Sequence, residues 1–356
     1  MNRKLLSIVP AIFAVIAIIL GALISEPIVS EPTQPTVDNI VSAPGEGSTF
    51  EVHFIDVGEG DASLIICDGE AMLIDGGEPE QSSKIYAYLK ENKVDRIKYL
   101  VATHGHSDHI GGLSAALNYA SVEMVLSSTT FYDTDVFEGF LRQLDKQKLA
   151  ITIPAKGDVF ELGSAKVLII GPGAKFDNEN DNSLVIKVIY GSNSFLFVGD
   201  AERTAEVAMV SESESNLRST VLKVGHHGSD TSTSYPFLRA IMPLYSVISV
   251  GGDNSYGHPT DTVISRLEDA GSEILRTDLR GTIIMRSDGE NISYVAEKKD
   301  EPGQELVTDG YIGNTNSKKF HRSDCANLPA EKNRVYFTSR QEAVSEHYVP
   351  CGNCNP

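Results

Sequence analysis

The pattern of hydrophobic and polar residues changes several times along the chain. An unbroken apolar run (5–24) is followed by a polar stretch without periodicity (26–48), and from about residue 50 short apolar or alternating segments begin. Alternating segments predict strands, and apolar residues three and four positions apart predict helices. Strands and helices succeed each other as far as residue 297, which predicts an α/β fold with two packed sheets and helices outside them.

The individual segments are short and sharply bounded. The predicted strands include FEVHFIDV, SLIIC, IKYLVAT, KVLIIG, SFLFVGD and TVLKVG, and the predicted helices include SSKIYAYLKEN, DVFEGFLRQLDKQ and TDTVISRLEDA. A second polar stretch, 298–310, separates this region from a small end, and polar segments of this kind are typical of linkers. The predicted division is an anchor or signal (1–25), a linker (26–48), a main domain (49–297), a linker (298–310) and a small module (311–356).

The first 25 residues predict a membrane anchor. Arg3 and Lys4 precede an apolar run of about 20 residues, the length that a bilayer span requires. The positive flank keeps the N-terminus inside and places the rest of the chain outside. A cleaved signal peptide has the same ingredients, but no A-x-A cleavage site ends the run, which favours the anchor. Both alternatives predict an extracytoplasmic location, with the membrane as one partner.

The net charge and the cysteine content limit the functions that the chain is expected to have. The formal net charge of −19 disfavours passive binding to a polyanion, because affinity for phosphate backbones comes from many Lys and Arg. Three of the four cysteines lie within the last 32 residues. Such crowding indicates a metal site more than a disulfide framework.

The stretch ATHGHSDHIGG (102–112) follows a predicted strand directly and places His104, His106, Asp108 and His109 within six positions. Imidazole and carboxylate together suit Zn or Mn. An exposed polar turn is the alternative, and four ligand-type residues at this spacing disfavour it.

The H-x-H-x-D-H pattern resembles the metallo-β-lactamase superfamily over about residues 50–296. The resemblance implies a four-layer αββα sandwich with two divalent metal ions at its edge. It implies a bridging ligand, Asp200 in FLFVGD, and a last histidine ligand, His226 in KVGHHGS. It also implies that Asp75 in LIDGG orients a ligand histidine, a role that fixes tautomer and ring direction.

One departure from the family concerns the first metal. Many members have a further histidine between the first cluster and the bridging aspartate, but residues 110–199 contain none. The segment NENDNSLV occupies that place, so Asn182 or Asp181 is expected to help, and the first site is expected to bind its metal less tightly. The implied sets are His104, His106 and Asp200 for the first metal, and Asp108, His109, Asp200 and His226 for the second.

A finer resemblance is to the extracellular hydrolase domain of ComEC-type competence proteins. HFIDVGEGDASLI, LIDGG, THGHSDHIGGL, NDNSLV, LFVGD, LKVGHHGS and NSYGHP carry it, in this order. Glu59 stands where that family commonly has Gln in G-Q-G-D, a change expected to alter a loop at the site entrance. The sequence holds one candidate membrane span, so we expect a tethered or secreted hydrolase and no DNA uptake by this chain alone.

Two histidine positions leave alternatives open. Adjacent side chains diverge, so only one of His226 and His227 is expected to be a ligand; His226 is predicted, with His227 as its supporting group or as a proton donor. His258, in YGHPT, is predicted to contact the substrate phosphate, and a loop histidine satisfied by its neighbours is the alternative. Asp108, His227 and His258 are the predicted catalytic residues.

The small module carries a second ligand pattern. His321-x3-Cys325 and Cys351-x2-Cys354 form two close pairs bridged by a longer loop, as in structural zinc sites. A Cys351–Cys354 disulfide is the alternative. The spacing resembles the zinc module of Ada-type DNA-repair proteins, in which a cysteine stands at the place of His321, so the resemblance implies the zinc fold and not the repair chemistry.

The predicted function is that of a metal-dependent phosphodiesterase, with water activated by two cations (Zn or Mn) and DNA as the first-ranked substrate. The module (311–356) has a net charge of +2 and is the region suited to a phosphate backbone, although a surface of mixed charge fits equally well. Two alternatives remain: hydrolysis of another phosphoester, such as a phosphocholine-bearing cell-wall polymer, and a non-catalytic, metal-folded surface binding protein.

Overall fold

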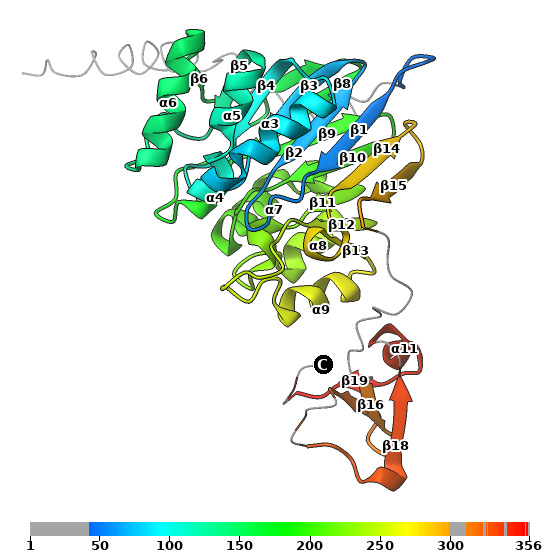
Figure 1. Cartoon of the computed structure of the whole chain (residues 1–356). Coiled ribbons are helices and arrows are strands. Elements are labelled where there is room, and N and C mark those ends of the chain that lie inside the picture. Colours follow the sequence, from blue (N-terminus) through cyan, green and yellow to red (C-terminus); the bar gives the residue numbers. More distant parts are fainter. Residues whose placement is uncertain are drawn as a thin grey trace, which may run out of the picture. The chain divides into compact units, whose positions relative to one another are not determined.

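Two sheets face each other in the computed structural model, which describes residues 43–298 and 311–354 except 323–324, 326, 338–339 and 353. The first sheet has the order β15-β14-β1-β2-β3-β4-β5-β6 and the second the order β13-β12-β11-β10-β9-β8-β7 (Figure 1).

The strand bounds follow the predicted segments closely. The first sheet contains β1 (Phe50–Phe54), β2 (Ser63–Cys67), β3 (Glu70–Ile74), β4 (Arg96–Ala102), β5 (Ser121–Ser127), β6 (Ile151–Thr152), β14 (Ile283–Ser287) and β15 (Ile292–Ala296). The second contains β7 (Val159–Leu162), β8 (Ala165–Gly171), β9 (Val185–Tyr190), β10 (Asn193–Phe197), β11 (Val221–Lys223), β12 (Tyr245–Ile248) and β13 (Glu273–Arg276).

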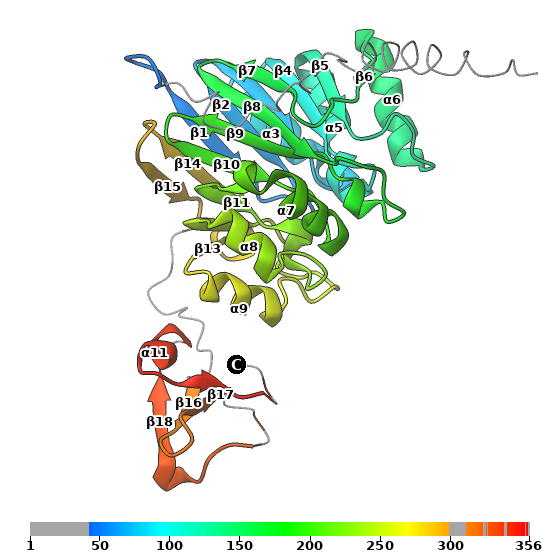
Figure 2. The same cartoon turned by 180° about the vertical axis from the view of Figure 1, so that it is seen from behind.

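Helices cover the outer faces of both sheets (Figures 1 and 2). Those that pack on the first sheet are α3 (Ser82–Glu91), α5 (Leu113–Tyr119) and α6 (Asp135–Gln147). Those that pack on the second are α7 (Arg203–Leu217), α8 (Tyr235–Ile241) and α9 (Asp261–Asp269). Two shorter helices, α4 (Ser107–Ile110) and α10 (Thr277–Arg280), follow strands at the sheet ends.

The side-chain alternation of β2 accounts for the layering. Ile65 and Cys67 join the core between the sheets, whereas Leu64 joins the core beneath the helices. Successive side chains of a strand point to opposite faces, so a strand buried on both faces is apolar throughout. The predicted four-layer α/β sandwich is confirmed.

Parallel pairing brings several strand ends to one edge. β3, β4 and β5 run parallel in the first sheet, and β10, β11 and β12 run parallel in the second. The segments after β3, β4, β10 and β11 therefore carry the candidate site residues at the carboxyl ends of strands, where α/β sheets commonly bind ligands.

The small module forms a sheet of its own, in the order β18-β16-β17-β19. Its elements are β16 (Tyr311–Asn314), β17 (Lys319–His321), β18 (Arg334–Phe337), α11 (Arg340–Ser345) and β19 (Val349–Pro350). Among its described residues, Phe320, Phe337, Ala343 and Tyr348 form one buried cluster, and Ile312 is also buried.

The predicted anchor (1–25) and most of both predicted linkers lie outside the described residues. Among the residues that the structure does describe, no helix has the length and apolar character needed to cross a bilayer. The extracytoplasmic location stays a prediction from the sequence.

Candidate metal centre

The histidine cluster sits on a sharp turn between β4 and α5. His104 and His106 lie in the segment that follows β4, and Asp108 and His109 lie in the one-turn helix α4. The glycines that follow allow a close approach to the neighbouring loop, because a Cβ on Gly112 would lie 2.1 Å from the carbonyl oxygen of Gly76. Close backbone packing of this kind holds the loop that carries Asp75 beside the cluster.

Two groups of ligand-type side chains share one carboxylate. What we call the first group contains His104, His106 and Asp200, and what we call the second group contains Asp108, His109, Asp200 and His227. The candidate ligand atoms of each group lie within 4.8 Å of one another.

Asp200, which follows β10, faces both groups. Its Oδ1 lies 3.2 Å from His109 Nε2 and 3.6 Å from His227 Nε2. Its Oδ2 lies 3.9 Å from His104 Nε2. This placement agrees with the bridging position that the sequence resemblance implies.

The donor set fits divalent cations. His109 Nε2 and Asp200 Oδ1 are buried without a hydrogen-bond partner among the described residues, and buried polar atoms are normally paired. In the first group, His104 Nε2 and His106 Nδ1 lie only 3.0 Å apart, so two imidazole nitrogens converge. A cation held by these atoms would satisfy all of them, and imidazole with carboxylate suits Zn, Mn or Fe.

The electrostatics of the second group also favour a cation. Burial alone would lower the pKa of His227, but the carboxylates of Asp200, Asp61 and Asp108 outweigh burial and raise that pKa to about 10. Burial is likewise outweighed at His109, whose pKa lies well above its usual value because of Asp200, Asp108 and Asp75. The carboxylate field that holds these protons attracts a divalent cation, which displaces them on binding.

In the first group, the effect of burial on a histidine pKa is not outweighed by the nearby carboxylates. Burial lowers the pKa of His104 well below its usual value, with help from the nearby charge of His109. The imidazole of His104 is therefore neutral and keeps the lone pair that a metal ligand needs.

A buried carboxylate supports one imidazole nitrogen on each side of the second group. His109 Nδ1 donates to Asp75 Oδ2 at 2.8 Å, and Thr103 donates to the same carboxylate through its backbone and its hydroxyl. The orienting position predicted for Asp75 is the one observed. His227 Nδ1 donates to the backbone carbonyl of Ser249 at 3.2 Å, and the carboxylate of Asp61 lies beside the same nitrogen, 3.1 Å away. Such partners fix the ring direction of a ligand histidine.

The support by Asp61 was missed in the sequence. Asp61 pairs with Lys223 Nζ at 2.8 Å, and both side chains are almost fully buried. Burial alone would raise the pKa of Asp61, and Lys223 together with His227 lowers it below its usual value. The available signals were an aspartate after a G-x-G turn and a lysine inside the apolar stretch TVLKVG.

Lys223→Met is expected to destabilise the sandwich by about 3 kcal/mol, because it leaves Asp61 buried without its cation. Lys98→Met is the control, since Lys98 pairs with Glu70 at a partly exposed position and should contribute less than about 1 kcal/mol. Urea unfolding measures both, and adding Asp61→Asn to Lys223→Met should recover part of the loss. Equal costs for the two lysines would contradict the assignment.

The structure brings His227, and not His226, into the second group. Both residues have positive φ, at 52° and 48°, within the turn Gly225–Gly228. That turn directs the imidazole of His227 inward. His226 is partly exposed, with Nδ1 3.0 Å from Glu202 Oε1 and 3.2 Å from Thr231 Oγ1, and its Nε2 lies 3.7 Å from Asp200 Oδ2 without joining either group. The geometry therefore favours the reverse of the roles predicted for these two histidines.

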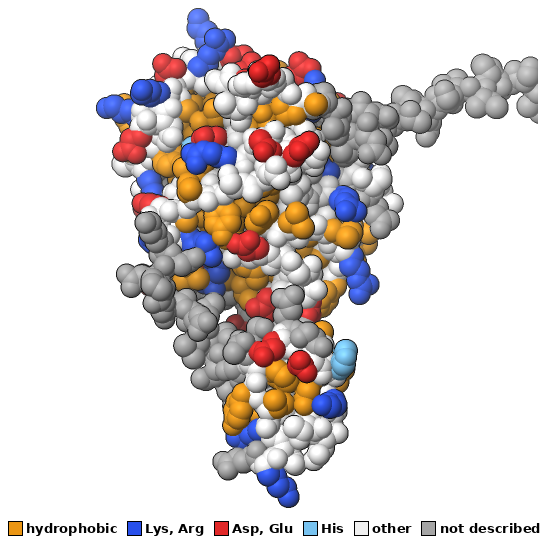
Figure 3. Space-filling model, turned by 90° about the vertical axis from the view of Figure 1, so that its right-hand side faces the viewer, with side chains coloured by type: hydrophobic (Ala, Val, Ile, Leu, Met, Phe, Trp, Pro, Cys, Tyr) orange, Lys and Arg blue, Asp and Glu red, His pale blue; other side chains and the backbone are white. Residues whose placement is uncertain are grey.

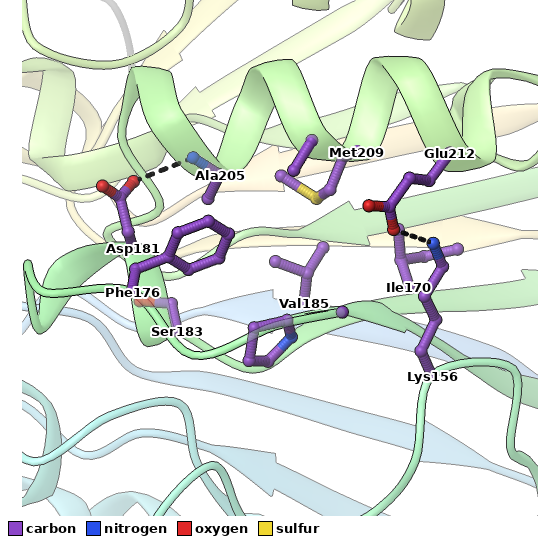
Figure 4. A pocket seen from close by; sticks show the side chains of 12 residues that line it. Lys156, Ile170, Phe176, Asp181, Ser183, Val185, Ala205, Met209 and Glu212 are labelled. Carbon is purple, nitrogen blue, oxygen red and sulfur yellow. Dashed lines mark hydrogen bonds and ion pairs between the residues drawn. The ribbon is translucent and has the colours of Figure 1, made fainter.

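The helpers expected for the first metal are used elsewhere. Asp181 Oδ1 accepts hydrogen bonds from the backbone N–H groups of Glu202 and Ala205, so its carboxylate faces the start of α7, beside the separate pocket of Figure 4. A carboxylate there is stabilised by the N-terminal end of the helix. Asn182 bonds through both side-chain atoms to the backbone of Phe176.

A pocket of about 540 Å³ opens above both groups. Among its lining residues are Glu59, Glu78, His106, Asp108, Tyr132, Asn180, Asp200, His226, His227, Tyr256 and His258. None of the described residues that line it is Lys or Arg. A neighbouring hollow of about 740 Å³ shares Tyr132 with it and reaches Phe131, which is 72% exposed.

His258 lies in the wall of this pocket, as a substrate contact would. Asn254 holds its loop, accepting from the His258 N–H and donating to the His258 carbonyl. His258 Nδ1 and Glu59 Oε1 are buried, have no hydrogen-bond partner among the described residues, and lie 3.8 Å apart. The ring of His258 also stacks on Tyr256, with 5.7 Å between ring centroids.

The small module gathers its four predicted ligands into one cluster. His321, Cys325, Cys351 and Cys354 each offer an atom within 4.8 Å of the others. All four cysteines of the chain are thiols, so the alternative of a disulfide is not what the structure contains. Burial, together with the neighbouring sulfurs of Cys325 and Cys351, raises the pKa of Cys354 to about 12. A cation is what such a cluster needs to hold several thiolates together.

Comparison with known families agrees with both parts. The profile described as "Metallo-beta-lactamase superfamily" matches residues 55–252. The chain belongs to the metallo-beta-lactamase superfamily. A second profile, "Metal binding domain of Ada", matches residues 307–356 and therefore covers the Cys/His cluster of this superfamily member.

Similar proteins include two relatives with competence-related names. ComE operon protein 3 of Bacillus subtilis is 29% identical over 67% of this chain and 33% of its own length. Competence protein ComA of Neisseria gonorrhoeae is 31% identical over 64% of this chain and 31% of its own length. The chain thus spans about a third of the length of these relatives. Among solved structures, the metallo-beta-lactamase fold protein YhfI of Bacillus subtilis is 12% identical, with a TM-score of 0.46, over 67% of this chain and 100% of its own.

Proposed function

We propose that this hydrolase-family chain is a metal-dependent phosphodiesterase that cleaves DNA outside the cytoplasmic membrane. The observation that carries the proposal is the position of Asp200, whose two oxygens face two separate groups of ligand-type side chains at the floor of one open pocket. The likeness to a protein named as a competence protein supports DNA as the substrate. The location outside the membrane rests on the predicted anchor (1–25).

The side chains of the site have separate roles in such a reaction. His104, His106 and Asp200 would hold one divalent cation, and Asp108, His109, Asp200 and His227 the other. When bound, two such cations supply an activated water and neutralise charge on a phosphodiester. Asp75 keeps His109 in the direction that this binding requires, and the Ser249 carbonyl, with Asp61 nearby, does the same for His227.

His258 is the group proposed to contact the phosphate. It lines the pocket with Nδ1 3.8 Å from Glu59 Oε1, and when the ring is doubly protonated its Nε2 can donate a hydrogen bond to a phosphate oxygen. A hydrogen bond of this kind to a charged oxygen is short and strong. His226, held by Glu202, lines the same pocket and offers a second contact to the substrate.

The pocket favours a substrate with exposed rings. Carboxylates line it, none of the described lining residues is Lys or Arg, and the neighbouring hollow adds Lys175, so attraction of a polyanion depends mainly on bound cations. Tyr256 is 71% exposed at the pocket, and Phe131 lies in the neighbouring hollow. Aromatic side chains of this kind stack on unpaired bases, which favours single-stranded over double-stranded DNA.

The same lining supports a second candidate substrate. Glu59 and Glu78 lie in the pocket with the rings of Tyr132 and Tyr256. Carboxylates with aromatic rings also suit a quaternary ammonium group, so a phosphocholine ester, as in some cell-wall polymers, is the alternative substrate.

Turnover by the purified chain tests the proposal. We expect the protein loaded with Mn or Zn to hydrolyse a chromogenic phosphodiester faster than the matching phosphomonoester, and single-stranded DNA faster than double-stranded DNA. Asp200→Asn is the inactive control, because it weakens the ligand that both groups share. Turnover of p-nitrophenyl phosphocholine without cleavage of DNA would favour the second candidate. If the metal-loaded protein hydrolyses none of these substrates, the result would favour a non-catalytic binding protein.

A further inference from the structure

The first group is poorer in ligands than the second. It contains two histidines and the shared carboxylate of Asp200, whereas the second group contains four ligand-type residues. Amide oxygens also bind divalent cations such as Mn, and the amide of Asn180 lines the pocket above this group.

Asn180 lines the same pocket as His106 and Asp200. It belongs to a short helical turn, Asn180–Asn182, and is 9% exposed. Its Oδ1 is buried without a hydrogen-bond partner among the described residues. A buried amide oxygen without a partner costs free energy unless something else binds it.

Hydrogen bonding fixes the direction of that oxygen. Asn180 Nδ2 donates to Glu202 Oε1 at 3.1 Å, and the reverse orientation would set the amide oxygen against a carboxylate oxygen. The backbone N–H of Asn180 donates to Asn178 Oδ1, which holds the turn. Glu202 in turn accepts from Asn178 Nδ2 at 2.9 Å. The amide is therefore oriented by contacts on its nitrogen side, and the oxygen is kept for another partner.

We propose that Asn180 Oδ1 is a ligand of the first metal, in the place where related proteins have a further histidine. This inference rests on the proposed two-metal site. Glu202 is the positioning residue: one of its oxygens binds Asn180 and also lies 3.0 Å from His226 Nδ1. An amide oxygen is a harder ligand than imidazole, so the exchange favours Mn over Zn at this position.

Metal binding tests the assignment independently of catalysis. The full chain, with zinc retained in its small module, is titrated with Mn and followed by calorimetry and by the EPR signal of free Mn. The wild type is expected to bind two Mn. Asn180→Ala should weaken one of these by at least about tenfold, a loss of the size seen when groups around a metal are removed. Asn180→Asp should retain both, and Asn180→His should raise the preference for Zn at the weaker site.

Asn178→Ala separates the ligand from its support. Asn178 is exposed and outside the pocket, and it reaches Asn180 only through Glu202 and the backbone N–H of the turn. This variant is expected to keep both Mn affinities within about threefold, since it alters only the outer support. Thermal unfolding without metal should be alike for all variants, and Asn180→Asp keeps the test decisive if the alanine variant unfolds.

Two negative results of the Mn titration would have different consequences. Wild-type affinity for both Mn ions in Asn180→Ala would overturn the ligand role of Asn180 and leave the proposed function standing. A wild type that binds a single Mn in the sandwich would overturn the two-metal proposal itself.

Discussion

His227→Ala is expected to lower the proposed phosphodiesterase activity by about a thousandfold or more, whereas His226→Ala should lower it by about tenfold. His227 contributes a buried imidazole to the second group, 3.1 Å from Asp108 Oδ2 and 3.6 Å from Asp200 Oδ1. Loss of a metal ligand removes several kcal/mol of transition-state stabilisation, and each 1.4 kcal/mol is about a factor of ten. His226 Nε2 also lies 3.7 Å from Asp200 Oδ2, but His226 belongs to neither group and its Nδ1 is held by Glu202 and Thr231, so its removal leaves both ligand groups in place.

The two variants form a matched pair, because they remove the same side chain at adjacent positions of one turn. Initial rates on a chromogenic phosphodiester and metal content per chain should be measured together. We expect His227→Ala to lose one metal and His226→Ala to lose none. The reverse ranking, in rate and in metal content, would return the ligand role to His226.

Cys354→Ser is expected to unfold the small module and to lower the metal content by one, while turnover of a small phosphodiester stays within about twofold of the wild type. The described residues of that module form only a small buried cluster, which is too little to stabilise a domain of this size by hydrophobic burial alone. In modules of this kind zinc binding supplies the folding free energy, about 10 kcal/mol or more. The sandwich has its own extensive cores and its own ligand groups.

Elemental analysis and limited proteolysis measure these effects. Cys67→Ser is the matched control, since Cys67 is buried between the sheets of the sandwich and lies in neither ligand group nor the zinc cluster. It should keep the full metal content and a protease-resistant module. A Cys354→Ser protein with an intact module and an unchanged metal content would contradict the zinc assignment. If the module also contacts DNA, deletion of 311–356 should reduce DNA cleavage and its salt dependence.

Several features of this protein follow from the sequence alone because they are local. The side-chain alternation of strands such as SLIIC and the helical spacing of SSKIYAYLKEN predict the elements, since each depends on residues a few positions apart. The cluster from His104 to His109 brings its ligands together within one turn, and the Cys/His spacing of the module does the same. The sequence resemblance also identified Asp200 and Asp75 as site residues, because the motifs that contain them lie at the ends of strands.

Other features depend on which way a side chain turns once the sheets have packed. Adjacent histidines diverge, and only the positive φ angles of the turn Gly225–Gly228 direct His227 inward. Three neighbouring side chains of NENDNSLV likewise differ in what they contact. Asp181 accepts a hydrogen bond at the start of α7, and Asn182 bonds to its own loop. Asn180 is the one whose side-chain oxygen is buried without a partner among the described residues.

The partnership of Asp61 with Lys223 likewise joins strand ends from the two sheets. Their separation along the chain is 162 residues, and neither residue belongs to the first or the second group, so no local pattern marks the pair. A buried charge requires an opposite charge at hydrogen-bonding distance, and only the packing of one sheet on the other decides which residue supplies it. The sequence determined which atoms could hold metal, and the tertiary structure decided which of them converge, because convergence depends on distances that local patterns do not contain.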